Sequence, residues 1–201
     1  MRKANLAATL AVAMLGVAGK ADAQQCAAPT LTVAADVTAN TTWSGCVLLQ
    51  QPIFVRNGAT LTIQPGTIVR GQPRTAAVAA GQIAGSPGAL IVTQTGRIVA
   101  NASAANPIIM TTAAVDNNQD GIVDFAPNGF EKPWVAGDLF LDNFPVTAPL
   151  APLQKSGLDT TGLWGGLVVL GNAPTNNANK AGVGFGKTLV EGLTVPGFPA
   201  A

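Results

Sequence analysis

A short phrase that occurs twice, thirty residues apart, constrains the fold of this chain more than any other feature. It begins at Gly58-Ala59 and again at Gly88-Ala89, and in both copies Gln, Gly and Ile-Val follow at the same offsets. Each copy describes two very short strands joined at a corner, and turn formers such as Asn57-Gly58 bound the strands. Spaced repetition of short β segments predicts a solenoid, in which each coil stacks on its neighbour.

The apolar residues follow the period-two pattern of strands, and no amphipathic helix separates the runs. We therefore predict an all-β chain that folds as a right-handed parallel β-helix with loop insertions. An antiparallel β-sandwich is the structural alternative, although it would need longer alternating strands. A strict alignment of the two phrases places Leu61 against Ile91, whereas matching inward faces favours Leu90, so the corner between the strands must absorb one residue.

The N-terminus predicts export. A basic start, Met1-Arg2-Lys3, precedes an apolar run from Leu6 to Ala18, and Ala21-Asp22-Ala23 supplies the small residues of a cleavage site. Residues 1–23 are therefore interpreted as a secretory signal peptide. No later apolar stretch is long and unbroken enough for a membrane span, so we expect a secreted or cell-surface protein without a transmembrane segment.

The remaining chain is long enough for one domain. We expect residues 24–57 to form an N-terminal cap and the first strands, and residues 58–201 to form the β-helix coils. Insertions are predicted at 71–87, which is rich in Ala, Gly and Gln, and at 113–160. Because the chain ends at Pro199-Ala200-Ala201 without a charged capping element, a truncated C-terminus is also expected.

The charge of the chain argues against nucleic acid as a partner, and its cysteines suggest an oxidising compartment. Without the signal peptide, eight basic residues face nine acidic ones, so the chain lacks the basic surface that nucleic acid requires. Two cysteines remain, Cys26 and Cys46, and a pair in an exported chain predicts a disulfide. Two buried free thiols are the alternative. A disulfide here would anchor the N-terminal end of the solenoid.

Acidic residues concentrate between Asp116 and Asp142, where an oxygen-rich loop matches the first part of an EF-hand-like calcium site. The predicted calcium ligands are Asp116, Asn118, Asp120, the backbone carbonyl of Ile122, and Asp124. Pro127 stands where a bidentate Glu would complete a full loop, so Asp138 or Asp142 would have to finish the shell. The alternative is a polar turn with solvated carboxylates, since Asn, Asp and Gly also favour ordinary turns.

Aromatic residues have two interpretations. Trp43, Trp134 and Trp164 could stack on sugar rings, but the Trp-Gly-Gly context of Trp164, beside an apolar strand, favours a corner or core position. Four phenylalanines near the acidic loop are expected to fasten it to the solenoid: Phe125, Phe130, Phe140 and Phe144.

Enzyme mechanisms are restricted because the chain contains neither histidine nor tyrosine. Ser-His and histidine-metal hydrolysis are excluded within this segment. A carboxylate mechanism stays open, such as a calcium-assisted polysaccharide lyase, with a cation acting as base or neutralising a uronate. The cations considered for this role are Arg56, Arg70, Arg74 and Lys132.

The run from Val55 to Thr67 resembles the opening of a widespread family of exported bacterial parallel β-helix proteins. Segments 88–92, 105–111 and 164–174 strengthen the resemblance. The resemblance implies the fold, a surface or secreted location and many further coils. It supplies no catalytic residues, because members of this family are largely uncharacterised.

The preferred functional hypothesis is a non-catalytic secreted or cell-surface β-helix protein with a structural, adhesive or envelope-associated role. Calcium is its expected cofactor, and surface glycans or envelope components are its expected partners. The alternative is a fragment of a carbohydrate-active, polysaccharide lyase-like β-helix enzyme.

Overall fold

The computed structural model describes residues 26–76, 85–120, 123–141 and 162–171. The signal peptide predicted at residues 1–23 lies outside this part of the chain. The described residues form ten short strands and no helix. These strands are β1 (Leu31–Val33), β2 (Thr41–Trp43), β3 (Cys46–Leu49), β4 (Pro52–Val55), β5 (Thr60–Ile63), β6 (Ile68–Gly71), β7 (Ala89–Val92), β8 (Arg97–Ala100), β9 (Ile109–Thr112) and β10 (Leu167–Val169).

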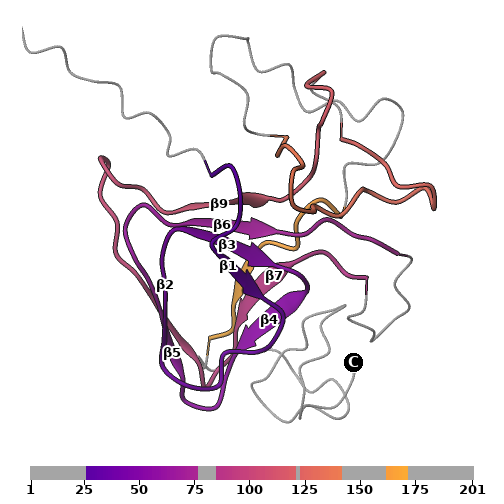
Figure 1. The fold of residues 1–201 in the computed structure, drawn as a ribbon. Helices are drawn as coiled ribbons and strands as arrows, with labels where there is room; N and C mark the ends of the chain where they lie inside the picture. Colours follow the sequence, from indigo (N-terminus) through magenta and orange to yellow (C-terminus); the bar gives the residue numbers. More distant parts are fainter. Residues whose placement is uncertain (1–25, 77–84, 121–122, 142–161, 172–201) are drawn as a thin grey trace, which may run out of the picture.

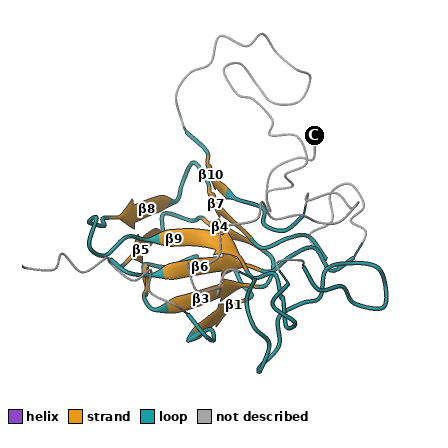
Figure 2. Cartoon of the chain, turned by 90° about the horizontal axis from the view of Figure 1, so that it is seen from above, coloured by secondary structure: helices purple, strands orange, loops and turns teal. Residues whose placement is uncertain are grey.

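The strands pair in parallel into three sheets, so the chain winds as a right-handed parallel β-helix (Figure 1). Sheet A has the order β1-β3-β6-β9, sheet B has β4-β7-β10, and sheet C has β2-β5-β8. Figure 2 shows from the side how successive strands of one sheet stack along the axis. Every pairing between these named strands is parallel. The predicted β-helix is therefore confirmed, and the antiparallel sandwich is wrong.

Tight corners follow from the turn residues of the sequence. Between β4 and β5, Asn57 has a φ of 59° and Gly58 a φ of 78°, the left-handed pair that an Asn-Gly turn supplies. Between β5 and β6, Gly66 has a φ of 79° after Pro65. These corners are short because glycine and asparagine tolerate the left-handed region, and each coil can therefore pass from one sheet to the next within a few residues.

The interior is a stack of aliphatic side chains from alternate positions of each strand. In sheet A, Val47 lies beside Val69, and in sheet B, Ile53 lies beside Leu90. The buried members of this core are Val37, Trp43, Val47, Leu49, Ile53, Val55, Ala59, Leu61, Ile63, Val69, Leu90 and Val92. Burying each large aliphatic side chain contributes about 1.5–3 kcal/mol, so the stacked interior is the main source of stability.

The register differs from the one expected from the repeated phrase. Leu61 on β5 pairs with Ile98 on β8, whereas Leu90 on β7 pairs with Ile53 on β4. The two copies of the phrase therefore lie in different sheets, and the predicted alignment of Leu61 with Ile91 or Leu90 is wrong. The physical reason is that each copy spans two strands, β5 and β6 or β7 and β8, whereas one coil contains three, so the second copy begins in sheet B and not in sheet C.

Both predicted insertions leave the solenoid at the corner between sheets A and B. One connects β6 to β7 and the other connects β9 to β10. They contact each other, because the Asn128 side chain donates to the Thr75 carbonyl at 3.2 Å and the Arg74 amide donates to the Gly162 carbonyl at 2.7 Å. The coils themselves begin at β1, so strands within residues 24–57 already belong to the parallel sheets.

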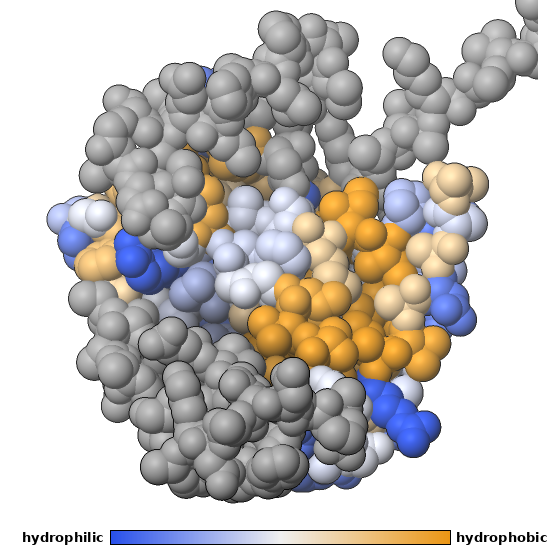
Figure 3. Space-filling model, turned by 180° about the vertical axis from the view of Figure 1, so that it is seen from behind, coloured by the Kyte–Doolittle hydropathy of each residue, from blue (hydrophilic) through white to orange (hydrophobic). Residues whose placement is uncertain are grey.

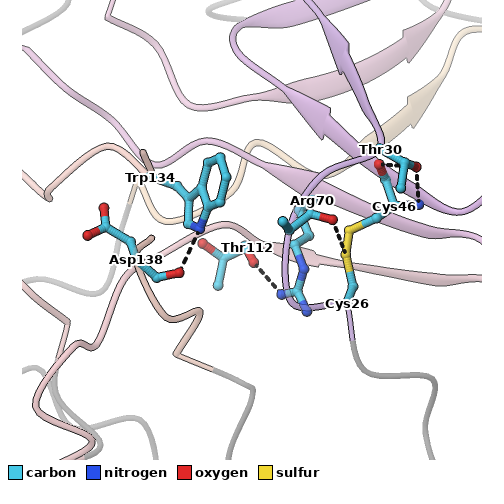
Figure 4. Close-up of a disulfide and its surroundings, with 8 residues drawn as sticks. Cys26, Thr30, Cys46, Arg70, Thr112, Trp134 and Asp138 are labelled. Atoms are coloured by element: carbon cyan, nitrogen blue, oxygen red, sulfur yellow. Dashed lines mark hydrogen bonds between the residues drawn. A yellow bond between two sulfur atoms is a disulfide. The ribbon is translucent and has the colours of Figure 1, made fainter. Parts of the chain in front are cut away.

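The structure contains the predicted disulfide between Cys26 and Cys46, with 5.9 Å between their Cα atoms (Figure 4). Cys46 opens β3, so the bond fastens the segment before β1 to the second strand of sheet A. Thr30 adds a polar contact, because its Oγ1 accepts from the Cys46 amide at 3.0 Å.

Candidate functional site

The insertion after β9 is the part of the chain where the sequence concentrates its candidate chemistry. Its two arms meet in isolated antiparallel bridges, one of them between Val115 and Phe140. Backbone hydrogen bonds extend this pairing: the Asp116 amide donates to Leu139 at 3.0 Å, and the Leu141 amide donates to Ala114 at 2.8 Å. This short irregular hairpin positions the acidic loop.

The insertion packs on the outer face of sheet A through its aromatic residues. Trp134 stacks on Phe140 with 5.4 Å between ring centres, and the guanidinium carbon of Arg70 lies 4.2 Å from the centre of the Phe140 ring. Phe140 also joins a buried cluster with Leu48 and Ile68, which point outward from β3 and β6. The prediction that phenylalanines fasten the acidic loop is confirmed for Phe140. Figure 4 shows Arg70 and Trp134 near the disulfide.

The predicted calcium ligands lie in a compact polar turn. Asp116 is buried, and its Oδ1 accepts from the Asp120 amide at 3.3 Å. The Asp124 carboxylate accepts from the Asn117 amide at 3.1 Å, and the Asn118 side chain donates to Asp120 at 2.9 Å. The structure thus brings four of the predicted ligands onto one loop. In each of these hydrogen bonds a carboxylate accepts from an N–H group of the same loop.

The fifth predicted ligand, the carbonyl of Ile122, lies outside the described residues. Gln119, within the same loop, has a φ of 59°, which places it in the left-handed region. Among the residues that the structure describes, no three His, Cys, Asp or Glu side chains gather as a group that could hold a metal ion.

Asp138 organises the base of the insertion. One of its oxygens, Oδ1, accepts from Lys132 Nζ at 2.6 Å and from Asn117 Nδ2 at 3.0 Å, while Oδ2 accepts from the Val135 amide at 3.0 Å. The Asp138 carbonyl also accepts from the Trp134 indole at 3.1 Å. The sequence offered Asp138 as a ligand to complete a calcium shell, but both oxygens are engaged by N–H donors. Asp142, the other candidate, lies outside the described residues.

The electrostatics of Asp138 follow from these contacts. Burial raises the pKa of the carboxyl, but the hydrogen bond from Lys132 together with those from Val135 and Asn117 outweighs it. The pKa therefore lies below its ordinary value of 3.8. At neutral pH, Asp138 is an anion that joins the stretch from Lys132 to Asp138 to Asn117 on the other arm of the insertion.

The cations proposed as catalytic bases all have structural partners. Arg56 Nε forms a 2.7 Å ion pair with Asp36, whose other oxygen accepts from the Phe54 amide. Arg70 is 2% exposed under Phe140, and its Nη1 donates to the Thr112 carbonyl at 3.1 Å. These two arginines therefore stabilise the coils.

The other two cations, Lys132 and Arg74, contact residues of the insertion after β9. Lys132 pairs with Asp138, and the guanidinium carbon of Arg74 lies 5.4 Å from the centre of the Phe130 ring. Arg74 thus links the insertion after β6 to the insertion after β9 through a cation–π contact. No simple sequence signal pairs Arg74 with Phe130, because strands β7, β8 and β9 lie between them in the chain, whereas Lys132 and Asp138 lie only six residues apart.

The tryptophans that could stack on sugars take packing positions. Trp43, on β2, is 1% exposed and belongs to the solenoid core. The Trp164 indole lies against the backbone of Gly71, which confirms the predicted corner or core role of Trp164. Trp134 stacks on Phe140. The sequence shows where the tryptophans stand along the chain, but the residues against which they pack depend on contacts between distant segments.

Within the described residues, no helix has the length and apolar character needed to cross a bilayer.

Comparison with known proteins gives a match to a family model. Residues 32–123 match the family described as a pectate-lyase-like β-helix domain. This match covers the coils from β1 to β9 and the start of the acidic loop, and it supports a β-helix family for the chain. No curated protein and no solved structure gives a significant match.

Proposed function

We propose that this chain is a non-catalytic β-helix protein, exported to the cell surface or the medium, which displays its insertions as a structural, adhesive or envelope-associated component. The observation that carries the proposal is the use of its cations. Arg70 is buried under the ring of Phe140, and Arg56 and Lys132 form ion pairs with Asp36 and Asp138. Side chains committed in this way stabilise the fold and are poorly placed to act on a polysaccharide.

Export is supported by the N-terminal sequence and by the disulfide. Cys26 lies three residues after the predicted cleavage site at Ala23, so the bond would form in the mature chain soon after translocation. Disulfides persist in oxidising compartments and are rare in reducing ones. A secreted or surface protein also meets surface glycans or envelope components, which are the partners we propose.

We also propose that calcium stabilises the loop from Asp116 to Asp124. The loop supplies carboxylate and amide oxygens, which are the ligands that calcium prefers. Binding would require the carboxylates to exchange part of their hydrogen bonding for the ion. The lack of a bidentate Glu at Pro127 favours weak affinity, with a dissociation constant on the order of 10⁻⁴ to 10⁻³ M.

Thermal unfolding of residues 24–201 by far-UV circular dichroism, with millimolar calcium and then with chelator, tests the calcium proposal. We expect calcium to raise the midpoint, and Asp120→Ala to remove that rise. Asn101→Ala, an exposed substitution on the turn after β8, is the matched control and should keep it. An identical midpoint in both buffers would leave the loop as a polar turn.

A polysaccharide lyase-like fragment is the second candidate, favoured by the description of the matching family. Incubation with polyuronates and calcium separates the two functions, because a lyase produces unsaturated ends that absorb in the ultraviolet. We expect no such product. Sedimentation of the protein with insoluble polysaccharide, by contrast, should detect an adhesive role. Product formation that is lost in Arg74→Ala would replace the adhesive proposal with the enzymatic one.

A further inference from the structure

The chain contains two Asn-Gly pairs, Asn57-Gly58 and Asn128-Gly129. Both pairs are exposed, and both glycines have a positive φ, +78° at Gly58 and +80° at Gly129. Asparagine before glycine can lose its side-chain amide, because the glycine nitrogen has no Cβ beside it to hinder its attack on the side-chain carbonyl carbon. Since the dipeptide, the exposure and the glycine conformation are alike, the hydrogen bonds of each pair decide which of the two can react.

Hydrogen bonds restrain the pair in the insertion after β9. The Asn128 side chain donates from Nδ2 to the Thr75 carbonyl at 3.2 Å, and its Oδ1 accepts from the Phe130 amide at 3.1 Å. The Gly129 amide donates to the Ala126 carbonyl at 3.0 Å. The side-chain amide and the nitrogen that would attack it are therefore both engaged, and reaction at Asn128 requires three hydrogen bonds to break.

The pair in the corner between β4 and β5 lacks these restraints. Among the described residues, no hydrogen bond involves the Asn57 side chain or the Gly58 amide. The Asn57 backbone amide donates to Thr95 Oγ1 at 3.1 Å, which holds the chain just before the reactive atoms. A Cβ added at Gly58 would meet no described atom within 4 Å, so the Gly58 nitrogen has room to turn towards the Asn57 side chain.

Water, the second reactant, has access to this corner. Figure 3 shows a continuous apolar patch on one face of the molecule, but the corner between sheets B and C consists mainly of polar residues and glycine, in Arg56–Ala59 and again in Thr93–Gly96. Asn57 and Gly58 are exposed, and so is Thr95 in the same corner of the following coil. The reactive pair is therefore solvated in the folded protein.

We propose that Asn57 is a site of spontaneous deamidation in the folded protein and that the fold protects Asn128. The Gly58 nitrogen gives up its proton and bonds to Cγ of Asn57, which closes a five-membered succinimide ring and releases the side-chain nitrogen as ammonia. Water then opens the ring. Cleavage between Cγ and the Gly58 nitrogen gives aspartate, whereas cleavage between the main-chain carbonyl carbon and that nitrogen gives isoaspartate. The proposal does not depend on the proposed function.

The isoaspartyl product alters the corner between sheets B and C. It adds one carbon atom to the backbone of a corner that has four residues in each of two successive coils. The Ala59 amide, which donates to the Arg56 carbonyl at 3.1 Å and closes this turn, would have to shift. Either product also places a carboxylate next in sequence to Arg56, which pairs with Asp36. Each modified chain therefore gains one negative charge at this corner.

Storage of the full chain in mildly alkaline buffer made with heavy-oxygen water tests the proposal. Peptide mass spectrometry at intervals measures conversion at each asparagine, the uptake of solvent oxygen and the share of isoaspartate. Each hydrogen bond is worth a factor of about two to ten, so the three bonds at Asn128 should make conversion at Asn57 faster by a factor of about ten or more. In the chain unfolded by urea the two rates should become similar, because the dipeptide is the same.

Asn57→Gln is the matched control. It keeps a side-chain amide, but attack on that amide would have to close a six-membered ring, which forms far more slowly, so position 57 should stay unmodified. Equal rates at Asn57 and Asn128 in the folded protein, or no reaction at Asn57 while the unfolded chain reacts, would overturn the proposal. Conversion of Asn57 to aspartate alone would also overturn it, since that product indicates direct hydrolysis without the ring. A difference in rate that persists in urea would show that the fold does not protect Asn128.

Discussion

The guanidinium of Arg70 and the ring of Phe140 form a cation–π contact of 4.2 Å that joins the solenoid to its largest insertion. Arg70 belongs to β6, and Phe140 comes from the connection between β9 and β10. Both residues are 2% exposed. A charge on the outer face of sheet A is thus covered by an aromatic ring instead of by water.

Replacing Phe140 by Ala should lower the free energy of unfolding by about 3–5 kcal/mol, because the change removes a buried ring and uncovers Arg70. Phe140→Leu keeps much of the volume and should cost less. Urea unfolding followed by circular dichroism measures both. Leu139→Ala is the control, since Leu139 is 38% exposed, and should change stability by less than about 0.5 kcal/mol. Equal losses at 139 and 140 would contradict the packing role.

The disulfide should contribute about 3 kcal/mol, because it closes a loop with a sequence separation of 20 in the unfolded chain. The free energy of unfolding of the double variant Cys26→Ser/Cys46→Ser should be lower by that amount, so the variant should unfold at a lower urea concentration. Adding reductant should destabilise the natural protein to a similar extent and leave the double variant unchanged. A natural protein that is insensitive to reductant at every urea concentration would show that the bond does not constrain the unfolded chain.

Asp138 should make stability depend on pH in the acidic range. Its folded-state pKa lies below 3.8, so the folded protein holds the proton less tightly than the unfolded chain does. The contribution is present above the unfolded-state pKa and is lost as the pH falls through the lower folded-state value. Asp138→Asn should cost about 2 kcal/mol at pH 7, since it weakens hydrogen bonds to a charged group.

The difference in the free energy of unfolding between the natural protein and Asp138→Asn should shrink as the pH falls below about 4. Urea unfolding at a series of pH values measures this difference. Lys132→Met is a useful companion, because it removes the ion pair and leaves the bonds from Asn117 and Val135 in place. A difference in the free energy of unfolding between the natural protein and Asp138→Asn that stays constant down to pH 2 would mean that the charge of Asp138 does not stabilise the fold.

Gly71→Ala should destabilise the protein by about 2–3 kcal/mol, because a Cβ at this position would overlap Trp164 and the carbonyl of Gly88. Gly58→Ala is the comparison. A Cβ at Gly58 meets no atom within 4 Å, but the φ of +78° strains a residue other than glycine, so the cost should be about 1 kcal/mol. Thermal and urea unfolding would give the order of the two variants. A larger loss at Gly58 would show that backbone conformation outweighs the steric overlap.

Local patterns predicted the fold because they depend on nearest neighbours. The turn at Asn57-Gly58 and the alternation of Leu61 and Ile63 are read from consecutive residues, and the structure has both. The register could not be predicted in the same way. Leu61 pairs with Ile98 across a connection whose length nothing in the repeated phrase specifies.

The candidate site was predictable in its composition and not in its contacts. The acidic loop was recognised from the spacing of its oxygens, and the structure brings Asp116 and Asp120 together. The use of Asp138 as the centre of the insertion was missed, because its partners Lys132 and Asn117 approach from both sides only after the hairpin has formed. Calcium at this loop remains a prediction.

The corner between sheets A and B carries both insertions, whereas the corner between sheets B and C keeps four residues, Arg56–Ala59 and then Thr93–Gly96, in successive coils. Mutations that lengthen the chain are therefore tolerated unequally around the axis. New loops can be added along one longitudinal edge without shifting any strand pairing, while the same additions between sheets B and C would disturb the coil. Evolution, or an engineer, can thus change what this protein presents to its surroundings by altering the loops at the corner between sheets A and B, while the corner between sheets B and C keeps its length.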